Sequence, residues 1–285
     1  GSFELGGSGD LHLVSGVIGT GATTRFDGSG RLRLSGGATF NANHALTIDS
    51  AFRMEGGTLG GSGNVDIGGA FTWAGGTMTG SGTTIVGGNG TIDNTSAYKY
   101  LGRRLDVTGS LVFGNTSGYY LQLNNGGHLH VAAGGSLGTS ASNGLIYLAS
   151  GNGGSALFSA DADGDIVLGA GTELTLRADG NVGNRLAGSS DLNGEGQLHL
   201  DSGMVSVDTD SAFTGDGRLL LSGGGTLAGS AVLSIASAFD WTGGGSMSGS
   251  GTTRLLRDLI AAARPGPTWL AGAAAGRQLQ TAPFR

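Results

Sequence analysis

Apolar residues recur along the chain in pairs that are two positions apart. Val65/Ile67 and Phe71/Trp73 are typical pairs, and a spacing of two places both side chains on the same face of a strand. Glycines separate the pairs, as at Gly68-Gly69, and glycine adopts the backbone conformations of tight turns at little cost. The pattern predicts short strands, each with one buried face, joined by sharp corners.

The strands belong to a repeat. The stretch AFTWAGGTMTGSGTT at residues 70–84 returns as AFRMEGGTLGGSGNV at 51–65 and, one residue longer, as AFDWTGGGSMSGSGTT at 238–253. A second element, apolar-x-Gly-x-Gly-x-Leu-x-Leu, starts in exact or looser form at residues 5, 26, 40 and 59 and again at 192, 213, 227 and 247. The two series have gaps of 21, 14 and 19 and of 21, 14 and 20 residues. We infer that a block of coils is duplicated at an offset of about 187 residues.

Three strands and three corners in each circuit define the expected architecture. The sequence predicts an all-β chain, a single-stranded right-handed parallel β-helix of about 19–21 residues per coil over residues 1–253. Longer and irregular loops are expected at residues 94–104, 140–143 and 180–193. The side chains expected to face inward are Leu32, Leu34, Val65, Ile67, Phe71, Trp73, Leu219, Leu221, Phe239 and Trp241.

The composition changes at Arg254. Residues 254–285 contain all three prolines of the chain, and Leu255, Leu256, Leu259, Ile260 and Ala263 follow a helical spacing. One interpretation is a short helical cap over the open edge of the last coil, which would otherwise promote aggregation. The other is a tail without a designed role.

Composition and charge exclude several classes of function. The chain has no cysteine, which rules out disulfides, thiolate metal sites and cysteine nucleophiles. Its net charge is −6 and it has one lysine, Lys99, so we expect no nucleic-acid partner. No run of 18 apolar residues predicts a membrane span in this fragment, and we expect the chain to be part of a longer protein.

Three phrases, GGTLGGSGNVDIGG, FTWAGGTMTGSGTT and LNNGGHLHVAAGGSL, resemble the glycine-rich repeats of large secreted bacterial surface proteins. These are the haemagglutinin-like and autotransporter-passenger adhesins, and the resemblance extends from Phe3 to Thr253. It implies a right-handed β-helix that is exported and displayed at the cell surface as a stalk or an adhesive body. The family has no catalytic motif to carry over. Candidate partners are a host or matrix glycan, a surface protein, or another copy of the chain associated end to end or laterally.

Asp161, Asp163 and Asp165 form the densest group of carboxylates in the sequence. Alternating aspartates around a glycine can supply oxygen ligands to calcium, and this is the one cofactor that the sequence suggests. The alternative, which we favour, is a solvated turn.

Histidines provide a second set of candidates. His12 and His199 each lie between two inward leucines of a Leu-His-Leu strand, so both are expected to point outward. His128 and His130 share a face and could in principle bind a metal. Neither pair has a second motif to complete a site, and solvated surface histidines are the expected reading.

Two functions remain from different classes. The leading expectation is a rigid structural or adhesive segment without catalytic activity, because the repeats use their residues for stacking. The alternative is a carbohydrate-active β-helix enzyme that uses the irregular loops between residues 94 and 193. Such chemistry needs paired carboxylates or a basic residue on one exposed face, and Arg103 and Arg104 near Asp106 are the candidates.

Overall fold

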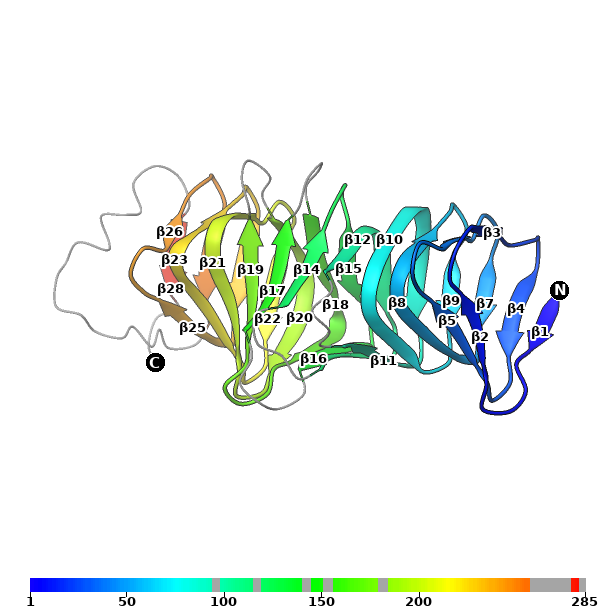
Figure 1. The fold of residues 1–285 in the computed structure, drawn as a ribbon. Helices are drawn as coiled ribbons and strands as arrows, with labels where there is room; N and C mark the ends of the chain where they lie inside the picture. The colour runs from blue at the N-terminus through cyan, green and yellow to red at the C-terminus, as the bar shows by residue number, and fades with distance from the viewer. Residues whose placement is uncertain are drawn as a thin grey trace.

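The computed structural model describes residues 1–93, 98–114, 119–139, 145–150, 156–178, 184–256 and 278–281. These residues form one elongated, all-β body in which parallel strands stack as a solenoid of about 10 turns (Figure 1). β1 lies at one end of the stack and β26 and β28 lie at the other. The expected parallel β-helix is therefore confirmed, and no helix occurs in the described part of the chain.

Each turn has three faces, which we number in the order in which the chain forms them from β2 onward. Face 1 contains β2 (Asp10–Leu13), β5 (Arg31–Leu34), β11 (Asn89–Ile92), β13 (Ser110–Phe113), β16 (Ser136–Thr139), β22 (Ser211–Thr214), β24 (Val232–Ile235), β27 (Thr252–Leu255) and β28 (Gln278–Thr281). Face 2 contains β3 (Val17–Gly19), β6 (Thr39–Asn41), β14 (Tyr119–Leu123), β17 (Leu145–Ser150), β19 (Glu173–Ala178) and β25 (Ala238–Trp241). Face 3 contains β1 (Ser2–Glu4), β4 (Thr24–Asp27), β7 (Leu46–Ile48), β9 (Val65–Ile67), β15 (His128–Val131) and β26 (Ser246–Met247). Seven longer strands continue around a corner: β8 (Ala51–Gly60), β10 (Phe71–Val86), β12 (Lys99–Val107), β18 (Ala156–Val167), β20 (Asn184–Asn193), β21 (Gln197–Ser206) and β23 (Arg218–Ala228).

The strand register shows how long each coil is. In the first part of the chain Asp10 pairs with Arg31 and Phe52 pairs with Phe71, so these coils have the predicted length. In the middle of the chain the coils are longer: His130 pairs with Ser159, at a sequence separation of 29. The added residues fall between strands, so the ladders remain parallel.

The core is a column of buried apolar side chains that runs along the stack from Phe26 to Leu255. Nine of the ten residues expected to face inward are at most 2% exposed: Leu32, Leu34, Val65, Ile67, Phe71, Trp73, Leu219, Leu221 and Phe239. The tenth, Trp241, packs against the core but is only half-buried. It lies on β25, and in the described part of the chain no strand pairs with the outer edge of β25.

Glycine at a corner allows one coil to sit directly on the next. At Gly80 the backbone has a φ of +99°, and a Cβ added there would lie 2.2 Å from the carbonyl oxygen of Gly61 in the preceding coil. Gly61 has the same kind of backbone, with a φ of +102°. A side chain at such a corner would push the coils apart, which explains why the GGSG and TGSG phrases recur.

The duplicated block is present in the structure, turned by one face. Leu11 pairs with Leu32 on face 1, whereas the equivalent residues 187 positions later, Leu198 and Leu219, pair on face 2. The corner geometry is also repeated, since Gly36 has a φ of +58° and Gly223 a φ of +62°. The repeat therefore specifies a strand with its corner, and any of the three faces accepts it.

Two of the expected loops are partly strands. β12 starts at Lys99, so Arg103 and Arg104 are strand residues, and β20 covers residues 184–193. These segments form strands despite their irregular sequence pattern, because they hydrogen-bond in parallel to the neighbouring coils. The third expected loop, residues 140–143, lies outside the described residues.

The tail begins as part of the stack. β27 continues to Leu255, which is buried, and β28 pairs with β27 in parallel. Leu255 therefore belongs to a strand and Leu256 follows it exposed. The other residues of the expected helical spacing, Leu259, Ile260 and Ala263, lie outside the described residues.

We expect Trp73→Ala to lower the free energy of unfolding by about 3–5 kcal/mol, because removal of a fully buried indole leaves a cavity. Urea denaturation of the variant and the wild type measures this. Trp241→Ala is the matched control and should cost less, because Trp241 is half-buried. Equal losses at the two positions would contradict the assigned core.

We expect Gly80→Ala to destabilise the fold by more than about 1 kcal/mol, through the positive φ and the clash with the Gly61 carbonyl. Gly37→Ala is the control, because a Cβ there would meet no atom within 4 Å, and a change within about 0.5 kcal/mol is expected. Thermal unfolding of both variants separates the two outcomes. A neutral Gly80→Ala would show that the corner has room for a side chain.

Candidate functional site

The most connected group of polar side chains lies on face 2, across three successive coils. His199 on β21 projects outward between the fully buried Leu198 and Leu200, as predicted. The residue is nevertheless only 8% exposed, because side chains of the two neighbouring coils cover its ring. Its Nδ1 bonds the Glu173 carboxylate on β19, and its Nε2 lies 2.6 Å from Ser222 Oγ on β23. The expectation of a solvated surface histidine is therefore wrong for His199.

The hydrogen bonds define the protonation of this group. Glu173 accepts a bond from Gln197 Nε2 at 2.7 Å and one from Thr175 Oγ1 at 3.0 Å. The bond from His199 is the main cause that lowers the pKa of Glu173, so the carboxylate is ionised at neutral pH. An ionised carboxylate only accepts, and therefore Nδ1 of His199 carries the proton. With the proton on Nδ1, Nε2 offers its lone pair to the Ser222 hydroxyl, which donates a hydrogen bond to it.

The other copy of the duplicated block contains half of this arrangement. His12 and Ser35 occupy the positions 187 residues before His199 and Ser222, and His12 Nε2 lies 2.7 Å from Ser35 Oγ. His12 is exposed, as predicted. Among the described residues no carboxylate bonds its Nδ1. The histidine–serine contact is thus common to both copies of the repeat.

A second polar group lies on face 3. His128 and His130 are on the same side of β15, as predicted, with ring centroids 5.6 Å apart. Both bond one hydroxyl on the next coil: Ser159 Oγ lies 2.6 Å from His128 Nε2 and 2.8 Å from His130 Nδ1. Ser159 and His130 are buried, so the prediction of a solvated surface histidine is wrong for His130 as well.

Burial determines the charge of His128. Desolvation, followed by the positive Arg104 and by His130 and Arg185, lowers the pKa of His128 to about 4. The ring is therefore neutral at pH 7. The single Ser159 hydroxyl donates to one ring and accepts from the other, which ties the two imidazoles to the protein and to each other.

The arginines of the proposed carbohydrate site do not converge. Arg103 is buried in a corner, where its guanidinium donates to the carbonyl oxygens of Gly82 (2.8 Å), Gly63 (2.9 Å) and Thr79 (3.4 Å). Burial lowers the pKa of Arg103 to about 10, so it remains charged at neutral pH. Arg104, the next residue, points outward and pairs with Asp106 at 2.5 Å. Arg103 stabilises three backbone carbonyls and is not available to a substrate.

The three aspartates lie on β18 where the strand passes from face 3 to face 1. Asp161 accepts a bond from the Ala133 amide at 3.2 Å and lies 3.5 Å from His130 Nε2. Asp165 accepts a 3.4 Å bond from Asn193. Asp163 is exposed, and its backbone carbonyl accepts from Gly134. In the part of the chain that the structure describes, no three histidine, aspartate or glutamate side chains gather as a metal site would require.

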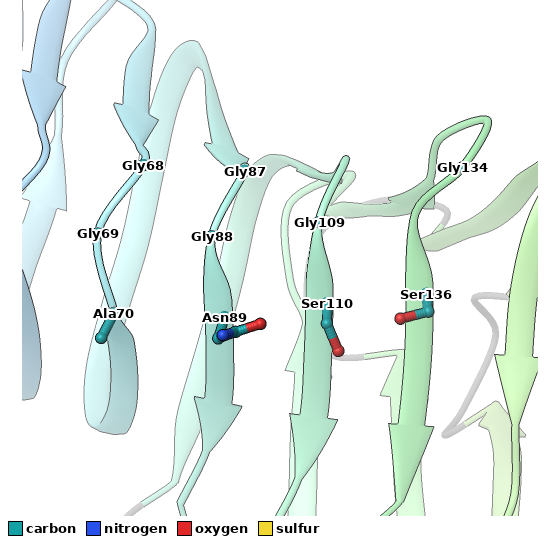
Figure 2. A pocket seen from close by; sticks show the side chains of 10 residues that line it. All are labelled: Gly68, Gly69, Ala70, Gly87, Gly88, Asn89, Gly109, Ser110, Gly134 and Ser136. Atoms are coloured by element: carbon teal, nitrogen blue, oxygen red, sulfur yellow. The ribbon is translucent and has the colours of Figure 1, made fainter.

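A shallow groove follows the corner between faces 3 and 1 across four coils (Figure 2). It has a volume of about 460 Å³ and is lined by small residues: Gly68, Gly69, Ala70, Gly87, Gly88, Asn89, Gly109, Ser110, Gly134 and Ser136. The amides of Gly68 and Gly69 both donate to Ile48, and those of Gly87 and Gly88 both donate to Ile67. These amides hold neighbouring coils together, so few of them are free to donate to a ligand. The groove exists because the residues at this corner have small side chains or none.

The sequence could have shown more of the face 2 group than we inferred. His199 and Ser222 are separated by 23 residues, as are His12 and Ser35. This separation is close to one coil, so it predicts stacking of the two side chains. Glu173 gave no such signal, because it pairs with Gln197, 24 residues later, whereas Gln197 pairs with Arg218, 21 residues later.

Comparison of the chain with protein-family models, with curated proteins and with solved structures gave no match. Among the described residues, no helix is long and apolar enough to cross a lipid bilayer.

We expect acid to destabilise the wild type partly through His128. The unfolded chain takes up this proton below about pH 6.5, but the folded chain does so only near pH 4, so the free energy of unfolding falls between those values. His128→Gln should reduce the loss of stability between pH 7 and pH 5 in urea denaturation, whereas His12→Gln should not. An NMR titration of His128 with a midpoint near 6.5 would contradict this account.

Proposed function

We propose that the chain is a structural or adhesive segment of a secreted bacterial cell-surface protein, in which the solenoid acts as a rigid stalk. The observation that carries the proposal is the uninterrupted core. Apolar side chains on all three faces are buried from Phe26 to Leu255, and adjacent coils exchange backbone hydrogen bonds throughout the described residues. About 10 turns at roughly 4.8 Å each give a stack on the order of 50 Å long.

The positions of the repeat phrases support this role. The glycines of GGSG and TGSG form corners, and the apolar residues beside them form core layers. The residues that resemble those of surface adhesins are therefore the residues that stack coils. A chain that uses its repeated positions in this way is suited to hold other parts of a protein at a distance.

The charged side chains on the outer surface of face 1 are consistent with a rod that is exposed to solvent. Ion pairs run between coils along face 1, with Arg33 bonding Glu55 at 2.5 Å and Arg53 bonding both Glu55 at 2.7 Å and Asp93 at 3.3 Å. Such partly exposed pairs each contribute little stability, but they keep an outward surface soluble. A glycan or a surface protein of the host or matrix is the partner that this role implies.

The carbohydrate-active alternative has less support. It requires Arg103, Arg104 and Asp106 to meet at an open surface, and Arg103 is instead bound to three backbone carbonyls within a corner. Arg104 and Asp106 pair with each other on the outer side of β12. We therefore propose the stalk or adhesin role rather than a carbohydrate-active one.

Antibodies raised against the purified chain should label intact cells of the source organism without permeabilisation, and external protease should remove the label. A cytoplasmic protein that becomes accessible only after permeabilisation is the control for cell integrity. Labelling of this chain only after permeabilisation would contradict the proposed location. Immunofluorescence with both antibodies on the same cells measures the outcome.

A further inference from the structure

We propose that Ser222, His199 and Glu173 form a nucleophilic triad, so that Ser222 accepts acyl groups from small uncharged esters. This proposal is independent of the stalk role and goes beyond the expectation of a chain without catalytic activity. It rests on the hydrogen-bonded path from Glu173 to His199 Nδ1 and from His199 Nε2 to Ser222 Oγ. Carboxylate, imidazole and hydroxyl follow one another in the order that activates a serine.

The hydrogen bonds along this path run in the direction that the reaction needs, with Nδ1 of His199 as a donor and Nε2 as an acceptor. Glu173 is held by Gln197 and Thr175, so it fixes the ring orientation and keeps the proton on Nδ1. Nε2 is then free to take the hydroxyl proton as the oxygen attacks. The Ser159 group on face 3 does not have this order of carboxylate, imidazole and hydroxyl with short hydrogen bonds. Two imidazoles share the Ser159 hydroxyl, and the Asp161 carboxylate is 3.5 Å from His130.

Ser222 is also reachable. The hydroxyl belongs to a half-buried residue, and the next two residues, Gly223 and Gly224, are exposed and have no side chain. A Cβ at Gly224 would meet no atom within 4 Å, so an ester carbonyl can approach over the open backbone. Asp201 lies 3.9 Å from His199 Nε2, and its negative charge disfavours anionic substrates. The surface therefore fits a small, uncharged ester.

The reaction is a balanced acyl transfer. Ser222 Oγ bonds the ester carbonyl carbon while its proton moves to His199 Nε2. The tetrahedral adduct then breaks its bond to the alkoxy group, which leaves as an alcohol with the proton from His199. Water attacks the acyl-serine, again giving its proton to His199, and the carboxylic acid leaves as Ser222 recovers its proton. Ser222 and His199 are the catalytic residues, and Glu173 is a positioning residue.

The purified full chain is incubated with a fluorophosphonate probe, and intact-mass spectrometry with peptide mapping locates the adduct. We expect one adduct, on Ser222, and release of p-nitrophenol from p-nitrophenyl acetate at a rate above that of buffer. Ser222→Ala should abolish both signals. Ser35→Ala is the matched control from the other copy of the repeat and should change neither.

Glu173→Gln tests the positioning role. It should slow labelling of Ser222 by about 100-fold or more, since loss of the carboxylate in such triads has large effects. It should also remove a downfield NMR resonance of the Nδ1 proton of His199. Circular dichroism and the urea midpoint establish that each variant is folded.

Three results would overturn the proposal. The first is a folded wild type that gains no adduct and does not accelerate ester hydrolysis. The second is labelling of Ser35 and Ser222 at equal rates, and the third is an unchanged rate in Glu173→Gln. Each would show that the face 2 group only holds the coils together.

Discussion

Parallel hydrogen bonding between consecutive coils is the interaction on which the rest of this structure depends. Each coil bonds the one before it in register, so equivalent positions are stacked along the axis. Inward positions then form continuous apolar columns, and corners stack backbone directly on backbone, as Gly80 does on Gly61. The short distance between stacked backbones leaves no room for side chains at such corners. The glycine content of the chain follows from that constraint.

The same stacking explains which features the sequence predicted. Pairs such as Phe71 and Trp73 signalled strands because a period of two is visible locally, and the glycine phrases signalled corners. The longer coils in the middle, such as the one that joins His130 to Ser159, were harder to predict because the repeat phrase is blurred there. Arg103 was also misjudged, because its place in a corner depends on carbonyls from two earlier coils that no local pattern reveals. Trp241 has the same inward position as Trp73 in the repeat but is only half-buried, and among the described residues its strand is paired on one edge only.

The polar groups depend on stacking in a different way. Side chains that point outward from adjacent coils lie within bonding distance of one another, so a histidine can be enclosed by residues before and after it without entering the core. His199 and His130 are buried for this reason, although their strands place them outward as expected. The duplicated block repeats this arrangement: the contact between His12 and Ser35 recurs at His199 and Ser222, and Glu173 also bonds His199.

Distances between spin labels along one face test the central claim, that consecutive coils stack in the described register. The absence of native cysteine allows labels at chosen outward positions on face 3, where Ser2, Arg25, Thr47, Asp66, Ile85 and Asp106 follow one another coil by coil. Pulsed electron paramagnetic resonance on the Arg25→Cys/Asp106→Cys and Ser2→Cys/Asp106→Cys pairs compares separations of four and five coils. The account predicts mean distances of roughly 19 and 24 Å, one strand spacing apart. Distances that do not increase with the number of intervening coils would contradict the solenoid.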